Sequence, residues 1–393
     1  MEDPYKGREQ SAAKHDILRT YLQVLAYKVA QGRGGARTIN YVDAFAGPWE
    51  SKQESLSDTS PSIALQTLLG VRRSLEDVGV NIDIRAFFVS PKQEGVDQLR
   101  RLERQFPRAT IEIVKGTFEE ALPAAQTFAV RGRDPFMFLF IDPTGWTGLP
   151  MRKLVPLLKV GRGEVLINFM LEFIRRFADV KDASTSGSME ALFGDSDCRD
   201  EWQGSTGDER DDLIVDAYCR RVAALGDFKH CASTPIFKPM EDREHFRLVY
   251  ATRSDVGLVT FRNVEAKGLA KQKQTRTKVK GEKRVERSGQ QEIFPANVMQ
   301  PSRTYEDLTR ERHLKRARTT LDAMMSARMV IQWDELLMAG LSYPMVRETD
   351  VKDWLKERVR QKSLEVLGLE GRQSMPQLGK RHQVRKTPPA DRP

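Results

Sequence analysis

The 393-residue sequence has few cysteines and no long hydrophobic run. Its three cysteines, Cys198, Cys219 and Cys231, form no CxxC pair and lie near no pattern of histidines, which argues against a disulfide framework and a zinc site. No segment reaches the roughly 18 consecutive apolar residues that a membrane-spanning helix needs, and the N-terminus carries no apolar signal segment. We therefore expect a cytoplasmic protein with no membrane partner and no metal site.

Several catalytic motifs are missing as well. The sequence contains no GxxxxGK[ST], HExxH or GxSxG pattern, which excludes the common phosphate-loop, zinc-peptidase and serine-hydrolase signatures. A nuclease or other phosphodiester enzyme is also disfavoured, because no carboxylate cluster suited to two metal ions is visible.

Charge is divided unevenly along the chain. Residues 266–393 hold 28 Lys and Arg against 16 Asp and Glu, whereas residues 1–265 hold 36 against 39. A basic part joined to a nearly neutral part predicts a nucleic-acid or other polyanionic partner for the basic part. A solvated charged helix is the alternative.

The first two-thirds of the sequence alternates between helix-like and strand-like segments. This alternation is typical of a parallel sheet covered by helices on both faces. Continuously apolar segments over 136–141 and 164–168 predict central strands, and 38–42 predicts an earlier one. Apolar runs over 246–251 and 257–261 predict a closing antiparallel pair. The fold class is therefore α/β, with a doubly wound Rossmann-like sheet.

Four parts are predicted along the chain. Residues 1–266 form the Rossmann domain, and residues 267–300 are too polar to build a core and form a basic helical linker. Helical periodicity returns over 301–365, where three short helices are compatible with a small helical, winged-helix-like domain. Residues 366–393 are rich in Pro, Gln, Lys and Arg, which predicts a disordered basic tail.

The first candidate site is the loop after the first predicted strand, because doubly wound sheets bind cofactors there. Gly47 lets the backbone pass close to a ligand, Asp43 can accept a hydrogen bond from an amino group or hydroxyl, and Pro48 stiffens the loop. An ordinary strand-end turn is the alternative. The loop consists of Asp43, Ala44, Phe45, Ala46, Gly47 and Pro48.

The second candidate site follows the most apolar strand, at Asp142-Pro143. In methyltransferases that act on amino groups, a D/N-P-P-aromatic loop stands at this place, and its oxygen orients the target nitrogen. Here Trp146 is displaced by one position, so it either stacks on a base or anchors the loop. Lys14 and His15, at the start of the first predicted helix, are placed to approach the same pocket, although a lone histidine on a helix is more often structural.

The sequence resembles the three-Cys-motif partner proteins of bacteria, whose genes accompany a radical-SAM-like protein that bears a three-cysteine motif. The matching motifs run in order from residue 14 to about residue 295. They are Lys14-His15-Asp-Ile-Leu18, Tyr41-Val-Asp-Ala-Phe-Ala-Gly-Pro48, Ser60-Pro61-Ser-Ile-Ala-Leu65, Ile141-Asp-Pro-Thr-Gly-Trp146, Leu166-Ile-Asn-Phe-Met170, Leu192-Phe-Gly194 and Phe261-Arg-Asn-Val-Glu265.

The resemblance implies a class I methyltransferase-like Rossmann domain followed by a winged-helix-like module, and it implies a three-Cys-motif protein as partner. Two departures from the family pattern fall in the pocket expected for S-adenosylmethionine. Trp49 stands where members usually have glycine, and Ser90, at the end of the second predicted strand, stands where they have a ribose-binding acid.

Two functions remain open from the sequence. The first is an S-adenosylmethionine-dependent methyltransferase-like enzyme that acts on nucleic acid, with the Asp43–Pro48 loop, Ser90, Lys14 and His15 around the cofactor. Asp142, Pro143 and Trp146 would then hold the methyl acceptor. The second is a catalytically degenerate Rossmann scaffold that binds nucleic acid and docks the partner protein, and the departures at Trp49 and Ser90 favour it. Whether the chain is an enzyme is therefore left open.

Overall fold

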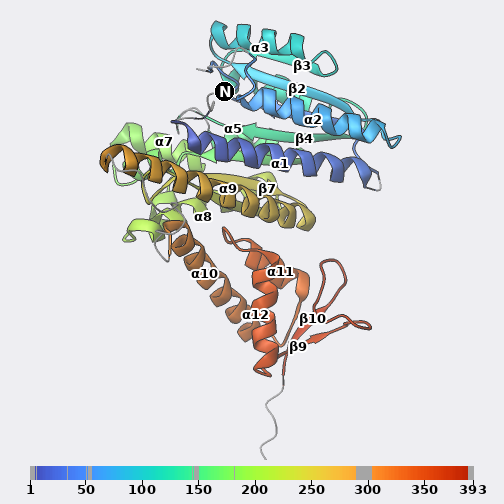
Figure 1. Cartoon of the computed structure of the whole chain (residues 1–393), viewed down its shortest axis with the longest axis vertical. Coiled ribbons are helices and arrows are strands. Elements are labelled where there is room, and N and C mark those ends of the chain that lie inside the picture. The colour runs from blue at the N-terminus through green and yellow to red at the C-terminus, as the bar shows by residue number, and fades with distance from the viewer. Residues whose placement is uncertain are drawn as a thin grey trace, which may run out of the picture. The chain divides into compact units, whose positions relative to one another are not determined.

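The computed structural model describes residues 5, 7–32, 34–49, 51, 55–143, 145, 150–180, 182–288 and 303–387. The chain divides into two compact units (Figure 1). The first comprises residues 1–257 and 268–291, and the second comprises residues 258–267 and 292–393. Within the described residues, no helix combines the length and the apolar character needed to cross a bilayer.

The first unit is built on one seven-stranded sheet in the order β3-β2-β1-β4-β5-β7-β6. Strands β1 to β5 are parallel to their neighbours, and β7 runs antiparallel to both β5 and β6. This order is typical of the class I methyltransferase variant of the Rossmann-like fold, so the predicted fold class is confirmed. The strands are β1 (Thr38–Asp43), β2 (Asp83–Ser90), β3 (Thr110–Lys115), β4 (Pro135–Ile141), β5 (Gly163–Phe169), β6 (His230–Phe237) and β7 (Glu244–Thr252).

Helices cover both faces of this sheet, which is why β1 and β5 are buried along their whole length and β4 is almost continuously apolar. Figure 1 shows α1 and α2 side by side on one face, where they contact each other. The first-unit helices are α1 (Glu9–Gln31), α2 (Ser60–Glu76), α3 (Gln93–Gln105), α4 (Phe118–Ala129), α5 (Met151–Leu158), α6 (Leu171–Phe177), α7 (Ala183–Phe193), a 3-10 turn (Cys198–Trp202) and α8 (Gly207–Gly226).

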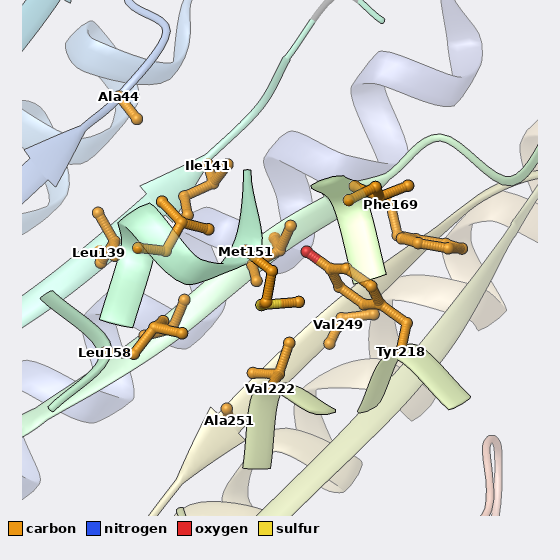
Figure 2. Close-up of a cluster of buried hydrophobic side chains, with 14 of the residues drawn as sticks. Ala44, Leu139, Ile141, Met151, Leu158, Phe169, Tyr218, Val222, Val249 and Ala251 are labelled. Atoms are coloured by element: carbon orange, nitrogen blue, oxygen red, sulfur yellow. The ribbon is translucent and has the colours of Figure 1, made fainter. Parts of the chain in front are cut away.

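A hydrophobic cluster between the sheet and helices α4, α5 and α8 forms much of the first unit's core. It joins Leu139 of β4 and Val249 of β7 to Met151 of α5 and Val222 of α8 (Figure 2). Burial of such side chains stabilises a fold by about 1.5 to 3 kcal/mol each. This packing holds the strands in place, so the ends of β1, β4 and β5 form a fixed frame for the loops that follow them.

The antiparallel edge is present, but one of its two predicted strands is wrong. Residues 257–261 belong to the long helix α9 (Asp255–Ser288), and the partner of β7 is β6. Leu258, Phe261 and Val264 are buried at a spacing of three residues, which is a helical period. The apolar run 257–261 alone is compatible with either a strand or a helix. The buried positions that continue at helical spacing along α9 identify it as a helix.

The second unit contains three helices and a small antiparallel sheet in the order β8-β10-β9. Its elements follow one another as α10 (Tyr305–Ala327), β8 (Val330–Gln332), α11 (Trp333–Leu341), α12 (Glu348–Arg360), β9 (Leu364–Leu367) and β10 (Gln383–Lys386). Trp333 and Trp354 are its largest fully buried side chains, and Arg262 of α9 is the next largest in this unit. Arg262 donates to the carbonyl oxygens of Leu341 and Ser342, at 2.8 and 3.1 Å.

The segment predicted as a disordered tail contributes a strand to this sheet. Val384 of β10 is fully buried and pairs with Ile331 on one side and Val366 on the other. The Pro, Gln and basic composition of this segment gave no sign of the single buried valine. The ladder hydrogen bonds around that valine hold the segment in the sheet, and the described residues continue through Thr387. The predicted linker is helical to Ser288, and its residues 289–300 lie outside the described part of the chain.

Candidate functional site

The predicted site residues gather where the ends of β1 and β4 meet. These two strands are parallel neighbours in register, with Asp43 opposite Phe140, and Asp142 follows β4 directly. On either side of them, β2 ends at Ser90 and β5 carries Asn168 near its end. Open α/β sheets bind their ligands at this edge, where strands on the two sides of β1 connect in opposite directions.

Lys14 of α1 forms an ion pair with Asp142. The distance from Nζ to Oδ2 is 2.5 Å, and the side chains are 10% and 17% exposed. The Lys14 ammonium also lies 5.9 Å from the centre of the Phe246 ring. A charge pair so little exposed to water is oriented tightly, because each partner replaces the other's lost hydration. The structure therefore places Lys14 at the predicted acceptor residue, Asp142.

Asn168 holds the other oxygen of the same carboxylate. Its Nδ2 donates to Asp142 Oδ1 at 2.7 Å and also lies 3.4 Å from Met170 Sδ. The contact with a carboxylate oxygen fixes the amide orientation, because the alternative would set two oxygens against each other. The Asn168 Oδ1 atom is buried and has no hydrogen-bond partner among the described residues. A buried acceptor of this kind can receive one donor from a ligand.

A small cavity adjoins Asn168. Its volume is about 10 Å³, which is close to one water-sized sphere, and Pro143, Gly145 and Tyr218 are among its lining residues. The polar end of Asn168 is therefore next to the Asp142-Pro143 loop rather than enclosed by hydrophobic core on every side.

Asp43 is completely buried and accepts three hydrogen bonds from its own surroundings. Phe45 N donates to Oδ1 at 3.1 Å, and the hydroxyls of Ser60 and Tyr41 donate to Oδ2 at 2.9 and 3.4 Å. Burial, the largest cause, raises the pKa of Asp43 to about 7, and the charge of Asp142 contributes to the rise. The three hydrogen bonds act in the opposite direction and lower the pKa. The carboxyl group thus ties the loop to β1 and α2.

The glycine of the first loop lies under Trp49. Gly47 has a left-handed backbone with φ of 84°, and a Cβ atom added there would come within 2.9 Å of the Trp49 ring. Gln98 of α3 fixes the backbone of Trp49 with two hydrogen bonds, to its N–H and its carbonyl oxygen, both at 3.0 Å. The tryptophan that departs from the family pattern therefore packs over the loop.

Ser90 closes the end of β2 against the same loop. Its hydroxyl donates to the carbonyl oxygen of Gly47 at 3.2 Å. Gly95 at the start of α3 packs so closely that an added Cβ would lie 2.1 Å from Ser90 Oγ and 3.0 Å from Pro48 N. The hydroxyl hydrogen is thus committed within the chain, and no carboxylate ends this strand.

His15 points to a different partner from its neighbour Lys14. The His15 ring lies 3.1 Å from the Tyr5 hydroxyl through Nδ1 and meets the Tyr5 ring edge-on. Burial holds the pKa of His15 well below its usual range, with the charge of Lys14 acting in the same direction. A neutral, buried histidine with one phenol partner fits a structural role in α1. Ala44 and Ala46 are also buried, and Phe45 packs against Phe118.

Pro143 directly follows Asp142 and lines the small cavity, as a loop-shaping residue would. Trp146, which was predicted either to stack on a base or to anchor the loop, lies outside the described residues. Asn168 was missed as a site residue in the sequence. The available signal was an asparagine inside the otherwise apolar buried strand β5, where a polar side chain needs a partner.

S-adenosylmethionine is the usual ligand of class I methyltransferase-like folds, and the residues where β1 and β4 meet fit it only in part. Asp43 is buried and bonded within the chain, and the charge of Asp142 is balanced by Lys14. At β2 the usual acid is replaced by Ser90, whose hydrogen is bonded to Gly47. A ribose contact from the end of β2 would rest on the remaining lone pairs of this hydroxyl.

No protein-family model matches the sequence, and no curated protein matches it. Among solved structures, the citrinin polyketide synthase CMeT domain is 14% identical with a TM-score of 0.29, covering 57% of this chain and 48% of that one. This chain thus matches about half of that domain's length. An O-methyltransferase family protein from Burkholderia thailandensis is 14% identical with a TM-score of 0.28, covering 62% and 59%.

Loganic acid methyltransferase with SAH is 12% identical with a TM-score of 0.30, covering 66% of this chain and 80% of that one. Scores this low carry no argument about activity, and the fold assignment rests on the strand order described above. The resemblance to the three-Cys-motif partner proteins stays a prediction.

Proposed function

We propose that this chain is an S-adenosylmethionine-dependent methyltransferase that acts on nucleic acid, with its acceptor site at Lys14, Asp142 and Asn168. The observation that carries the proposal is the orphaned Asn168 oxygen beside the Lys14–Asp142 ion pair, at the sheet edge where this fold binds ligands. Asn40 Oδ1 on β1 is also buried without a partner among the described residues, so the support comes from the position of the Asn168 oxygen beside the ion pair and the Asp142-Pro143 loop.

The three side chains have separate tasks in this proposal. Lys14 and the Asn168 amide hold the two oxygens of Asp142 in place, and the free Asn168 oxygen accepts a hydrogen bond from the acceptor group. When bound, S-adenosylmethionine supplies an activated methyl group. An amino group that becomes methylated must release a proton, and in this proposal the Asp142 carboxylate receives it by giving up one of its bonds to Lys14 or Asn168.

The test combines cofactor binding with methyl transfer. Titration calorimetry with S-adenosylhomocysteine should give binding, and a labelled methyl group should pass from S-adenosylmethionine to DNA or RNA. Asp142→Ala should abolish transfer while the chain stays folded. Asn40→Ala is the control, because Asn40 is also buried and its oxygen also lacks a partner among the described residues, but its amide donates to the carbonyls of Ala129 and Arg131 and not to Asp142. Transfer retained in Asp142→Ala would refute the assignment.

The nucleic-acid part of the proposal concerns the second unit. The order of α10, β8, α11, α12, β9 and β10, with the sheet β8-β10-β9, supports its interpretation as a winged-helix module. The excess of Lys and Arg in residues 266–393 favours a polyanion as its ligand. Binding to labelled DNA and RNA duplexes should weaken steeply as salt rises, because phosphate contacts release counterions.

A three-Cys-motif protein is the proposed partner, and this part of the proposal rests on the sequence motifs alone. Expression of the tagged chain together with such a protein should recover both in a fixed ratio on affinity purification and gel filtration. Elution of the two proteins as separate peaks at micromolar concentration would count against the pairing.

A degenerate scaffold without methyl transfer is the second candidate, and the end of β2 favours it. Ser90, Gly95 and the Gln98–Trp49 pair are bonded to, or packed against, the first loop at the end of β2, where class I methyltransferases usually hold the ribose. In that case calorimetry at millimolar S-adenosylhomocysteine gives no heat, whereas nucleic-acid binding persists. The same titration therefore separates the two candidates.

A further inference from the structure

Some basic side chains of the second unit form ion pairs with Asp or Glu, and others do not. Between residues 360 and 381, all five basic residues are exposed and form no ion pair among the residues that the structure describes, namely Arg360, Lys362, Arg372, Lys380 and Arg381. Elsewhere in the described second unit, exposed Lys267, Lys315 and Arg347 also lack an ion pair, but they stand singly on α9, on α10 and just before α12. We call the five between residues 360 and 381 the wing cations. Two stand at or just beyond the C-terminal end of α12, and three lie in the segment 368–382 that connects β9 to β10. That segment contains one acidic residue, Glu370.

The body of α12 shows the opposite arrangement. Lys352 pairs with Glu348 at 2.7 Å, and Lys356 pairs with Asp353 at 2.9 Å. Arg358, in the last turn of α12, forms an ion pair with Asp322 of α10 at 2.6 Å. Positive charge on α12 is therefore balanced by neighbouring carboxylates, which would also repel a phosphate group.

Two wing cations occupy backbone conformations that disfavour them. Lys362 and Arg381 have φ angles of 57° and 55°, in the left-handed region where glycine is favoured. Glycine is common nearby, and Gly368, Gly371 and Gly379 adopt positive φ in the same hairpin. Lys362 owes this conformation to the end of α12, where a Schellman-type cap forms and Ser363 N donates to the carbonyl oxygen of Arg358 at 3.0 Å. Arg381 has no helix end beside it, and a long basic side chain in a strained loop conformation points to a use for its charge.

The loop around Lys380 and Arg381 is held rigidly on both sides. Gly379 N donates to both carboxylate oxygens of Asp334 at 3.1 Å. The buried His382 accepts from Gln377 N at 3.0 Å, and its carbonyl oxygen accepts from Trp333 N at 2.8 Å. The two cations thus extend from an ordered loop, which lowers the entropy cost of binding a ligand there.

We propose that the wing cations bind the phosphate backbone of a nucleic acid, and that the charge-balanced face of α12 does not carry this binding. The inference rests on the nucleic-acid ligand proposed above and adds where it is held. Unpaired exposed cations in a fixed loop are suited to phosphate oxygens, whereas paired ones must first give up an existing partner.

The experiment uses the full chain, a fluorescein-labelled DNA duplex of mixed sequence and fluorescence anisotropy over a range of salt concentrations. Arg381→Gly and Lys362→Gly each remove one charge and also relieve the backbone. Both should weaken binding severalfold and reduce the slope of log K against log salt by about 1 each. Neither should lower the melting temperature, so weaker binding would not reflect unfolding.

Two matched variants complete the design. Lys356→Ala removes an exposed but ion-paired cation of α12 and should leave affinity and salt slope close to those of the unmodified chain. Arg381→Lys keeps the charge and should keep most of the binding. Unchanged binding in both glycine variants would overturn the assignment to the wing, whatever the result for Lys356→Ala. An unmodified chain that binds no duplex would overturn the nucleic-acid ligand itself.

Discussion

The two halves of the sheet edge where β1, β2, β4 and β5 end differ in how many of their polar groups are hydrogen-bonded within the chain. Around β1 and β2, Asp43 accepts from three groups of the chain, the Ser90 hydroxyl is bonded to Gly47, and Gln98 holds Trp49. Around β4 and β5, Asn168 retains a buried oxygen without a partner among the described residues. The buried atoms of β1 that lack a partner, Thr38 Oγ1 and Asn40 Oδ1, lie earlier on the strand, so spare capacity at the strand ends themselves marks the β4–β5 half as the place to look for a ligand.

The largest expected effect is on the free energy of unfolding, and it comes from protonation of Asp43 in the β1–β2 half. Asp43 has an ordinary pKa near 3.8 and a folded pKa of about 7, so folding favours the protonated form. Its contribution to stability is greatest below pH 4, falls as pH rises to about 7, and is constant above that. A shift of this size corresponds to a loss on the order of 4 kcal/mol.

Asp43→Asn removes this ionisation and should flatten the profile. Urea denaturation from pH 4 to pH 8 should show the variant gaining stability relative to the unmodified chain as pH rises. Profiles that run parallel over this range would mean that Asp43 ionises normally, and the two halves would then be more alike than described.

The next effect tests the ion pair of the β4 half. Lys14→Met leaves Asp142 with one hydrogen-bonding partner in a poorly hydrated position, and it should lower the free energy of unfolding by about 3 kcal/mol. Adding Asp142→Asn should recover most of the loss, since the uncompensated charge disappears. Equal losses in the single and double variants, measured by urea denaturation, would show that Lys14 acts through packing on Phe246 instead.

Closure of the β1–β2 half is tested at Gly95. Gly95→Ala forces a methyl group to within 2.1 Å of Ser90 Oγ and should destabilise the chain by about 2 kcal/mol. Combining it with Ser90→Ala removes the nearest clashing atom and should restore part of the stability. A tolerated Gly95→Ala, seen as an unchanged melting temperature, would indicate that this half opens more readily than its contacts suggest.

The smallest effect separates two buried asparagines. Asn168→Ser loses one hydrogen bond to Asp142, whereas Asn40→Ser loses two bonds to carbonyl oxygens at the far end of β1. We expect a cost of about 1 kcal/mol for Asn168 and more for Asn40. Methyl transfer should show the reverse order, with the larger loss in Asn168→Ser. The same order in both measurements would place Asn168 among ordinary structural residues.

Much of the fold was predictable because its central strands have a distinctive composition. The apolar runs at 136–141 and 164–168 correspond to β4 and β5, and the edge positions of Asp43 and Asp142 follow from the strands they end. The run at 257–261 was misassigned, since β-branched and aromatic residues also suit one face of a buried helix. Short-range composition does not distinguish these cases.

The site was only partly predictable, because hydrogen-bond partners depend on tertiary contacts. Lys14 and Asp142 are 128 residues apart, and no local pattern links them. Ser90 looked like a weakened ribose contact, and its bond to Gly47 became visible only once α3 was seen to pack Gly95 against it. Asn168 required the knowledge that its amide faces a carboxylate.

Helix α9 determines how the chain can be divided for expression. Residues 258–267 belong to the second compact unit, where Arg262 is bonded to Leu341 and Ser342, and Glu265 accepts from Met345 N at 3.1 Å. A fragment that starts at residue 292 therefore lacks part of its own interior. During synthesis, this interior is made long before its surroundings and must wait for roughly the last hundred residues to emerge before it can be covered.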